Sequence, residues 1–225
     1  MKYLLHGDDT VLSRNMLSGL VEGFTIIRLD GKTAALKEME EYLLSTGLFG
    51  EKKAVVVESL LTKNPKKKEL VKFLNEVKDS VLLVLWEDKK LPKTALTPLK
   101  NFTVREFLLP TTYFQFLDSF TERNGKKLFV MYQELLKTVS AEQVFYSLLK
   151  RLRLLLIMSG NGTSEELSKM SPWQKQKLSQ QVRFWSRNAL LCFYKELQDT
   201  EIKLKSGKLP LGLSKHLDTL ILSQL

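Results

Sequence analysis

The sequence predicts an α/β unit followed by an all-α unit. In the first 110 of its 225 residues, short apolar runs alternate with amphipathic stretches. After Leu108-Leu109-Pro110 the apolar residues recur only at the three- and four-residue spacing of helices. Strands that alternate strictly with helices form a parallel sheet with helices on both faces. A change of pattern at a proline indicates a domain boundary, so we expect domains at residues 1–109 and 110–225.

The expected strands are short apolar runs, as is typical of strands buried on both faces of a sheet. Segments of helical periodicity lie between them. The expected strands are residues 3–5, 24–29, 54–57, 81–86 and 102–107, and the expected helices are residues 10–21, 33–44, 66–77 and 93–99.

In the second half, one helix has a clear start. Ser171 is a suitable N-cap, Pro172 suits the first helical position, and Gln174 completes a capping box. We expect Asn161-Gly162 to end the helix before it and Ser206-Gly207 to precede the final helix. The apolar face of the Ser171 helix is expected to run through Leu178, Val182, Trp185, Leu190 and Phe193.

The composition excludes several classes of protein. With 44% hydrophobic and 27% charged residues, the chain is expected to be globular rather than disordered. The N-terminus turns acidic at Asp8 before the apolar core of a signal peptide develops. The apolar runs fall short of the ~20 residues that a membrane helix needs. We therefore expect a cytoplasmic protein that makes no membrane contact.

Metal and thiol chemistry have few candidate ligands. Cys192 is the single cysteine, and its apolar helical surroundings predict a place in the core. His6 and His216 are the only histidines, and neither is paired with acidic or thiol ligands at metal spacing. We expect no metal, no cofactor and no catalytic set built on serine, cysteine or histidine.

The net charge of +10 is unevenly distributed. Residues 1–110 carry 18 basic and 15 acidic groups, whereas residues 111–225 carry 17 and 10. Such an excess favours a polyanionic partner, because phosphate contacts release counterions. Lysines that only solubilise helical faces explain any one cluster equally well, including Lys66-Lys67-Lys68.

The segment Gly31-Lys32-Thr33 superficially resembles a phosphate-binding loop. Such a loop needs a glycine five residues before Gly31, and Ile26 stands there. We expect this segment to begin a helix that Asp30 or Thr33 caps.

Glu87 and Asp88 follow the fourth expected strand, where a magnesium-binding acid would lie in an ATPase. Without a phosphate-binding loop they have nothing to act on. We expect both to be solvated loop residues.

The helical half contains two arginines and two tryptophans that could contact a partner. Arg151 and Arg153 point about 200° apart around a helix, so we expect one at a helix interface and the other facing solvent or a neighbouring subunit. Trp173 and Trp185 are expected to anchor the core or an interface rather than to stack on bases.

The segment Gly47-Leu48-Phe49-Gly50 sets two large apolar side chains between glycines, directly before the third expected strand. Flanking glycines allow a sharp reversal of the backbone. Leu48 and Phe49 either pack back under the sheet or project as an anchor for a partner, and their residue types leave both alternatives open.

Six segments follow one another along nearly the whole chain. They are residues 5–9 (Leu-His-Gly-Asp-Asp), residues 45–53, residues 116–118 (Phe-Leu-Asp), residues 152–155, Ser171-Pro172-Trp173 with Lys177, and residues 201–207. In this order and spacing they resemble the delta subunit of the bacterial DNA polymerase III clamp loader.

The resemblance implies an ATPase-like α/β domain that has lost nucleotide binding, a small helical lid domain, and a helical collar domain that joins the loader pentamer. It also implies that a Leu-Phe pair before the third strand inserts into a hydrophobic pocket of the sliding clamp and helps to open the ring. In this sequence the pair is Leu48 and Phe49, and Thr46 and Gly47 precede it at the same tip.

The chain departs from typical members of that family. It is markedly shorter, and residues 108–120 pass almost directly into collar-like helices, so the lid is missing or vestigial. Glu201 and Lys205-Ser206-Gly207 stand where the family has Asp and Lys-Thr-Gly. The resemblance further implies a collar or subunit interface, whose candidate residues are Arg153, Trp173, Lys177 and Lys205.

We therefore predict a noncatalytic clamp-loader delta subunit. Residues 1–109 would contact the sliding clamp, and residues 110–225 would join other loader subunits as the collar. Primed DNA would be a partner of the assembled ring. Two alternatives stay open: an active ATPase that uses Lys32, Thr33 and Asp88, and a free-standing basic helical module that binds DNA.

Overall fold

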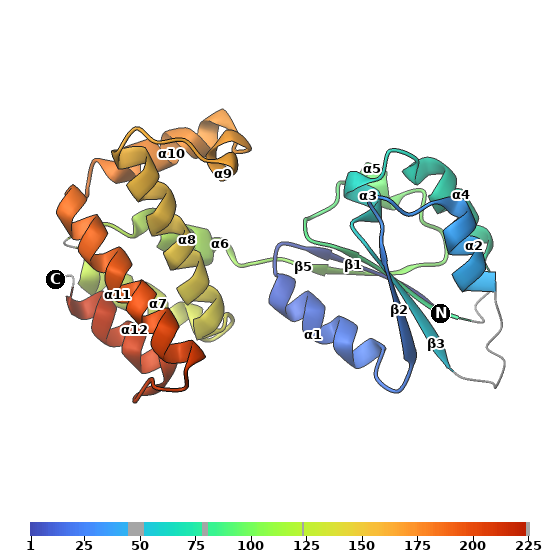
Figure 1. Ribbon diagram of the computed structural model, residues 1–225, viewed down its shortest axis with the longest axis horizontal. Helices are drawn as coiled ribbons and strands as arrows, with labels where there is room; N and C mark the ends of the chain where they lie inside the picture. Colours follow the sequence, from blue (N-terminus) through green and yellow to red (C-terminus); the bar gives the residue numbers. More distant parts are fainter. Residues whose placement is uncertain (45–51, 78–80, 123, 224–225) are drawn as a thin grey trace. The chain divides into compact units, whose positions relative to one another are not determined.

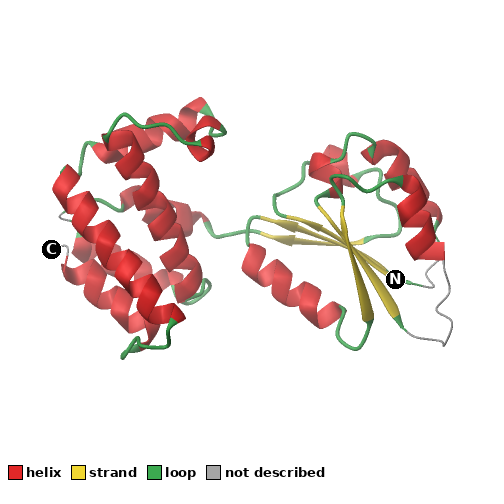
Figure 2. Ribbon diagram, viewed as in Figure 1, coloured by secondary structure: helices red, strands yellow, loops and turns green. Residues whose placement is uncertain are grey.

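The computed structural model describes residues 1–44, 52–77, 81–122 and 124–223. Contacts divide the chain into two compact units, Met1–Leu109 and Pro110–Leu225 (Figure 1). The first unit alternates strands with helices and the second contains helices only, which confirms the predicted fold class (Figure 2).

A five-stranded parallel sheet in the order β2-β3-β4-β1-β5 forms the centre of the α/β unit. Its inner strands β3 and β4 are buried along most of their length, whereas the edge strands β2 and β5 are largely exposed. Burial on both faces explains the continuous apolar runs in the sequence. The strands are β1 (Lys2–Gly7), β2 (Thr25–Asp30), β3 (Lys53–Glu58), β4 (Leu82–Glu87) and β5 (Thr103–Phe107).

Two apolar layers cover the sheet. On one face Leu17 of α1 packs against Leu5 and Val84. On the other face Met39 of α2, Leu60 of α3 and Leu74 of α4 pack against the sheet. Figure 1 shows α1 on one side of the sheet and α2 to α5 on the other. The helices of this unit are α1 (Thr10–Leu20), α2 (Leu36–Leu44), α3 (Leu60–Lys63), α4 (Lys67–Glu76) and α5 (Lys93–Leu96).

The connections after β2 and β3 differ from the sequence-based expectation. Helix α2 begins at Leu36 rather than at Thr33, because residues 30–34 form a turn closed by the Asp30 carbonyl, which accepts from the Thr33 and Ala34 amides at 3.2 and 3.0 Å. The short helix α3 was not predicted. It follows Ser59, whose φ of 62° turns the chain sharply at the end of β3.

The helical unit packs around α8, the helix that contacts α6, α10, α11 and α12. Its core contains a group of aromatic rings, in which Phe120 stacks on Phe193 and Trp185 with centroid distances of 5.3 and 6.0 Å. The helices are α6 (Thr111–Ser119), α7 (Gly125–Leu135), α8 (Ala141–Ser159), α9 (Glu165–Ser168), α10 (Pro172–Val182), α11 (Arg187–Lys205) and α12 (Gly212–Ser223).

The predicted capping box at Ser171 and Gln174 is present. The expectation that one helix runs from Ser171 to Phe193 is wrong, because the chain turns after Val182 and Ser186 caps a second helix through the Ala189 amide.

Cys192 also departs from its prediction. It is exposed, because it lies on the opposite side of α11 from the buried Leu190 and Phe193.

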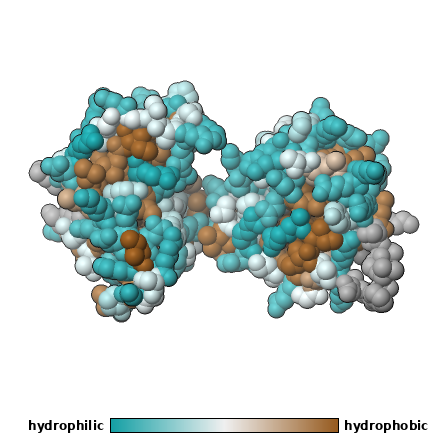
Figure 3. Space-filling model, viewed as in Figure 1, coloured by the Kyte–Doolittle hydropathy of each residue, from teal (hydrophilic) through white to brown (hydrophobic). Residues whose placement is uncertain are grey.

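Both units expose apolar surface in patches among hydrophilic residues (Figure 3). In the described part of the chain, no helix combines the length and apolar character needed to cross a membrane.

Gly31 is a position where a side chain has no room. A Cβ there would lie 2.6 Å from both the Glu58 carbonyl oxygen and the Leu60 amide nitrogen. We expect Gly31→Ala to lower the free energy of unfolding by about 1–3 kcal/mol, because the backbone between β3 and α3 must shift. Gly19→Ala is the matched control in α1, where a Cβ meets nothing within 4 Å. It should raise stability by about 0.5–1 kcal/mol. Equal effects of the two substitutions in urea unfolding would contradict the crowding at Gly31.

His6 should make stability depend on pH. Its imidazole is 1% exposed and its Nδ1 accepts a hydrogen bond from the Leu91 amide at 3.2 Å. Burial lowers its pKa below 6.5, Lys90 adds to this effect and Glu106 opposes it. The unfolded chain therefore binds a proton on His6 at a pH where the folded chain does not. The stability contribution is complete above pH 6.5 and is lost as the pH falls below it.

The measurement is urea unfolding between pH 5 and 7.5. We expect a weaker pH dependence for His6→Asn, whose Oδ1 can still accept from Leu91 but does not titrate. His216 also has a lowered pKa and Glu87 a raised one, but both are present in the two proteins and cancel in the comparison. Parallel stability curves for the two proteins would show that His6 does not contribute.

Candidate functional site

The turn after β1 lies where an open α/β sheet usually binds its ligand. Such ligands bind outside the carboxyl ends of the strands, at the point where the strand order reverses. The chain here passes from β1 to the far edge at β2, returns through β3 and β4, and crosses to β5 on the other side of β1. A phosphate would therefore be expected at the β1–α1 turn, facing the start of α1.

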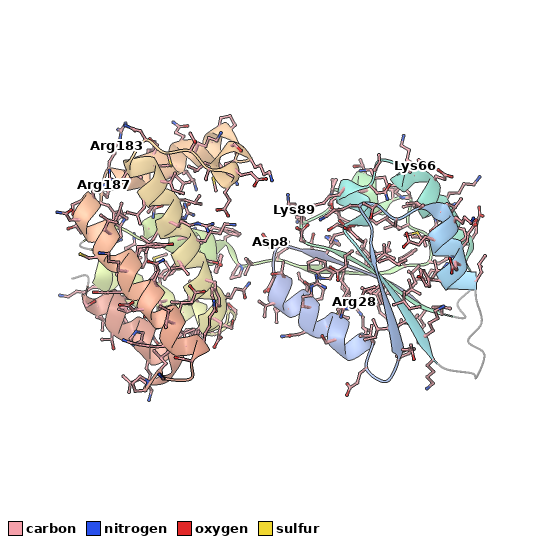
Figure 4. All side chains as sticks on the ribbon, viewed as in Figure 1. Asp8, Arg28, Lys66, Lys89, Arg183 and Arg187 are labelled. Atoms are coloured by element: carbon pink, nitrogen blue, oxygen red, sulfur yellow. The ribbon has the colours of Figure 1, made fainter. Side chains whose placement is uncertain are left out.

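In this protein the turn is filled by its own side chains. Asp9 is 2% exposed, and its Oδ1 accepts a hydrogen bond from the Leu12 amide at 3.0 Å, so a carboxylate already caps α1. Asp8 accepts from the Leu109 amide at 2.8 Å, and Figure 4 shows it beside the start of α1. Gly7 has φ +144°, and a Cβ there would lie 1.7 Å from the Phe107 carbonyl oxygen. Two carboxylates, and the close approach of the Gly7 backbone to Phe107, thus lie at the turn where a phosphate would be expected.

The Gly31-Lys32-Thr33 turn does not offer a second phosphate cradle. The Gly31 amide donates to the Glu58 carbonyl at 2.7 Å, and the Lys32 amide donates to Asp30 Oδ1 at 3.0 Å. The Gly31 carbonyl accepts from the buried Asn64 amide group at 2.6 Å. Asp30 and Thr33 close this turn rather than cap a helix. The segment follows edge strand β2, whereas Asp88 follows β4, with β3 between them.

The expectation that Glu87 and Asp88 are both solvated is wrong for Glu87. Its side chain is fully buried and accepts from the Leu61 amide at 2.6 Å and from Thr62 Oγ1 at 2.6 Å. Burial raises its pKa, and the hydrogen bonds from Thr62 and Leu61 oppose that rise. Glu87 therefore caps α3 and joins it to β4. Asp88 is partly exposed and forms an ion pair with Lys63 at 3.7 Å.

An arginine cluster at the end of β3 was not predicted. Arg14 of α1 binds Glu58 through two hydrogen bonds of 2.6 and 2.7 Å, and its guanidinium lies 3.6 Å from the Trp86 ring centroid. Arg28 binds the same carboxylate at 3.2 Å. The hydrogen bond from Arg14 is the main reason that the pKa of Glu58 is lowered. The residue types were visible in the sequence, but only the topology brings α1, β2 and β3 together here.

The helical unit contains a groove between α6, α8 and α10 with a volume of about 550 Å³. Asp118 lies in it and binds Arg151 at 3.0 Å and Lys177 at 2.6 Å. Lys177 Nζ is also 4.4 Å from the centroid of the Trp173 ring, which lies at the rim. The Tyr113 hydroxyl, which also lines the groove, forms a hydrogen bond with Ser147.

Of the four residues suggested for a subunit interface, only Trp173 and Lys177 line this groove. Arg153 is exposed and binds Glu166 at 2.5 Å, and Lys205 binds Glu201 at 2.7 Å. The helical spacing correctly separated Arg151, which is largely buried against Asp118, from the exposed Arg153.

The predicted clamp-binding residues, Leu48 and Phe49 with Thr46 and Gly47, lie outside the described residues. Helix α2 ends at Leu44, and β3 begins at Lys53. Among the residues that the structure describes, no three histidine, cysteine or acidic side chains are grouped so as to hold a metal ion.

Comparison with known proteins gives one family match. Residues 2–105, which form almost the whole α/β unit, match the family model for DNA polymerase III, delta subunit. No curated protein sequence matches the chain.

Two solved structures share a distant likeness with the chain. The DNA clamp loader delta protein of Bacillus subtilis is 15% identical with a TM-score of 0.44, and the alignment covers 99% of this chain and 94% of that one. A DNA polymerase III, gamma subunit-related protein of Thermotoga maritima is 15% identical with a TM-score of 0.37, at 100% and 93% coverage. At this identity and TM-score, neither structure supports a conclusion about the function of the chain. Over residues 2–105, slightly less than half of its length, the chain is therefore similar to the DNA polymerase III delta subunit.

Proposed function

We propose that this chain is the delta subunit of a DNA polymerase III clamp loader and that it acts by binding rather than by catalysis. The family match over residues 2–105 carries the proposal. The filled β1–α1 turn supports it, because Asp9 occupies the helix N-terminus that would otherwise face a phosphate. A nucleotide would have to displace this cap and approach two carboxylates.

The proposed clamp contact is the pair Leu48 and Phe49, with Thr46 and Gly47 beside it. The motif and its family resemblance support this assignment, as does its position between α2 and β3. The amino ends of parallel strands share one edge of the sheet, so β3 begins on the edge opposite the filled turn. A clamp contact made there would not depend on a ligand at the carboxyl edge.

The helical unit is proposed to join the other loader subunits as a collar. Residues 111–225 hold most of the excess positive charge, with 17 basic and 10 acidic groups. In the assembled ring this charge would weakly attract primed DNA.

Nucleotide binding separates this proposal from an active ATPase. We expect no saturable binding when the purified chain is titrated into labelled ATP with Mg²⁺ up to millimolar concentrations, because Asp9 accepts from an amide at the start of α1 and the Gly31 and Lys32 amides are bonded within the protein. Micromolar binding that disappears in Lys32→Ala would overturn the noncatalytic assignment.

The clamp contact is tested by the double substitution Leu48→Ala, Phe49→Ala. Each side chain is worth about 1.5–3 kcal/mol if it is fully desolvated in a clamp pocket, so affinity for the cognate sliding clamp should fall about 100-fold or more. Surface plasmon resonance with immobilised clamp measures this change. The matched control is Val11→Ala, Leu12→Ala on α1, where both side chains are exposed; it should bind like the wild type. If the double variant binds the clamp with wild-type affinity, the assignment of Leu48 and Phe49 as the clamp contact is wrong.

A further inference from the structure

We propose that the groove between α6, α8 and α10 binds a segment of another loader subunit that carries a carboxylate beside a large apolar side chain. The proposal rests on the function proposed above. It adds a binding site and the chemistry of its occupant.

The size of the groove suits such a segment. Its volume of about 550 Å³ falls within the range of about 300–1,000 Å³ that is usual for binding pockets. A second cavity of about 240 Å³ shares Asp118 and Lys177 with it and ends at Phe184. Both cavities are lined by described residues of the helical unit alone, so the site is complete within one unit.

The rim of the groove carries large aromatic side chains in contact with water. Trp173, which lines the groove, is 62% exposed, and Phe184, which lines the second cavity, is 66% exposed, whereas Trp86 and Trp185 are 6% and 7% exposed. Phe114 adds a third partly exposed ring. Exposed tryptophan and phenylalanine beside a cavity are typical of protein interfaces, where tryptophan is prominent among the residues that dominate binding.

The charges of the groove favour an anionic group. Lys150, Arg151 and Lys177 line it together with the carboxylate of Asp118, and Lys150 is paired with Glu166, which does not line the groove. Asp118 serves both Arg151 and Lys177, so one negative charge balances two positive ones. The Arg151 side chain is only 16% exposed. Its partners are the shared carboxylate of Asp118 and the neutral amide of Gln181 at 3.4 Å, which repay its desolvation incompletely. A second carboxylate at this point would lower the electrostatic free energy.

A protein segment fits these charges better than a nucleic acid does. A phosphate backbone needs a row of cations. Here Lys150 is paired with Glu166 at 2.9 Å, and Asp118 balances one of the charges of Arg151 and Lys177, so the groove has one positive charge in excess. A single carboxylate next to an apolar side chain meets the cations and fills the apolar walls.

The test measures assembly with the remaining cognate loader subunits by sedimentation velocity. We expect Trp173→Ala and Lys177→Glu each to weaken association at least 10-fold, and Trp173→Phe to retain most of it. Lys175→Glu is the matched control, with the same charge change on the same helix but outside the groove. Because Trp173 is exposed, its removal should leave the thermal midpoint unchanged, which separates a binding defect from unfolding.

Tryptophan fluorescence reports the site directly. Burial of Trp173 should shift the emission of the wild-type chain to shorter wavelength when the subunits are added, and the shift should be absent in Trp173→Ala. All four variants should bind the sliding clamp like the wild type.

If wild-type protein binds neither clamp nor subunits, the proposed function fails. If wild type assembles and the groove variants assemble equally well, only the groove assignment fails. If Trp173→Ala instead loses binding of a 20-nucleotide oligothymidine and keeps assembly, the occupant is nucleic acid and the inference is overturned.

Discussion

Parallel strands are joined by right-handed crossovers, and this constraint decides which helix covers which face of the sheet. The chain leaves β1 in one direction to reach β2, and every later crossover runs in the opposite direction. One helix, α1, therefore covers one face, while α2 to α5 cover the other. The start of α1 then lies at the carboxyl end of β1, beside the ends of β3 and β4. Arg14 reaches Glu58 and Trp86 only because of this placement.

At the carboxyl edge of the sheet, acidic side chains satisfy groups that a nucleotide would use in a phosphate-binding protein. Asp9 accepts from an amide at the start of α1, Glu87 caps α3, and Glu58 takes two hydrogen bonds from Arg14. Each carboxylate neutralises a helix N-terminus or a guanidinium from within the same unit. These carboxylates therefore make this edge of the sheet electrostatically unfavourable for a phosphate.

The fold class could be predicted from the sequence because buried parallel strands must be apolar along their length. In β3, Val55, Val56 and Val57 are consecutive apolar residues, and all three are fully buried. The errors arose where a tertiary contact overrides a local pattern. Glu87 is buried because α3, a helix of four residues, presents amides to it.

The candidate site was less accessible from the sequence than the fold. Asp9 stands directly before the first residue of α1, and an aspartate at that position is an N-cap signal. Its importance, however, depends on the position of β1 in the sheet. The roles of Leu48 and Phe49 remain predictions that rest on motif and resemblance.

Each unit holds one carboxylate between two cations, but the surroundings of the two sites differ, and this difference indicates where an acidic partner can bind. At the sheet edge, Glu58 is held by Arg14 and Arg28. Asp8 and Asp9 lie at the start of α1, the helix that supplies Arg14, so a further anion meets repulsion there. In the helical groove, Asp118 is held by Arg151 and Lys177, and the side chain of Arg151 is largely withdrawn from water. Coulomb interactions strengthen as water is excluded. Covering the groove with an apolar segment would therefore increase the attraction between the cations of the groove and an incoming carboxylate. Apolar burial and charge pairing thus reinforce each other in the groove, whereas they oppose each other at the sheet edge.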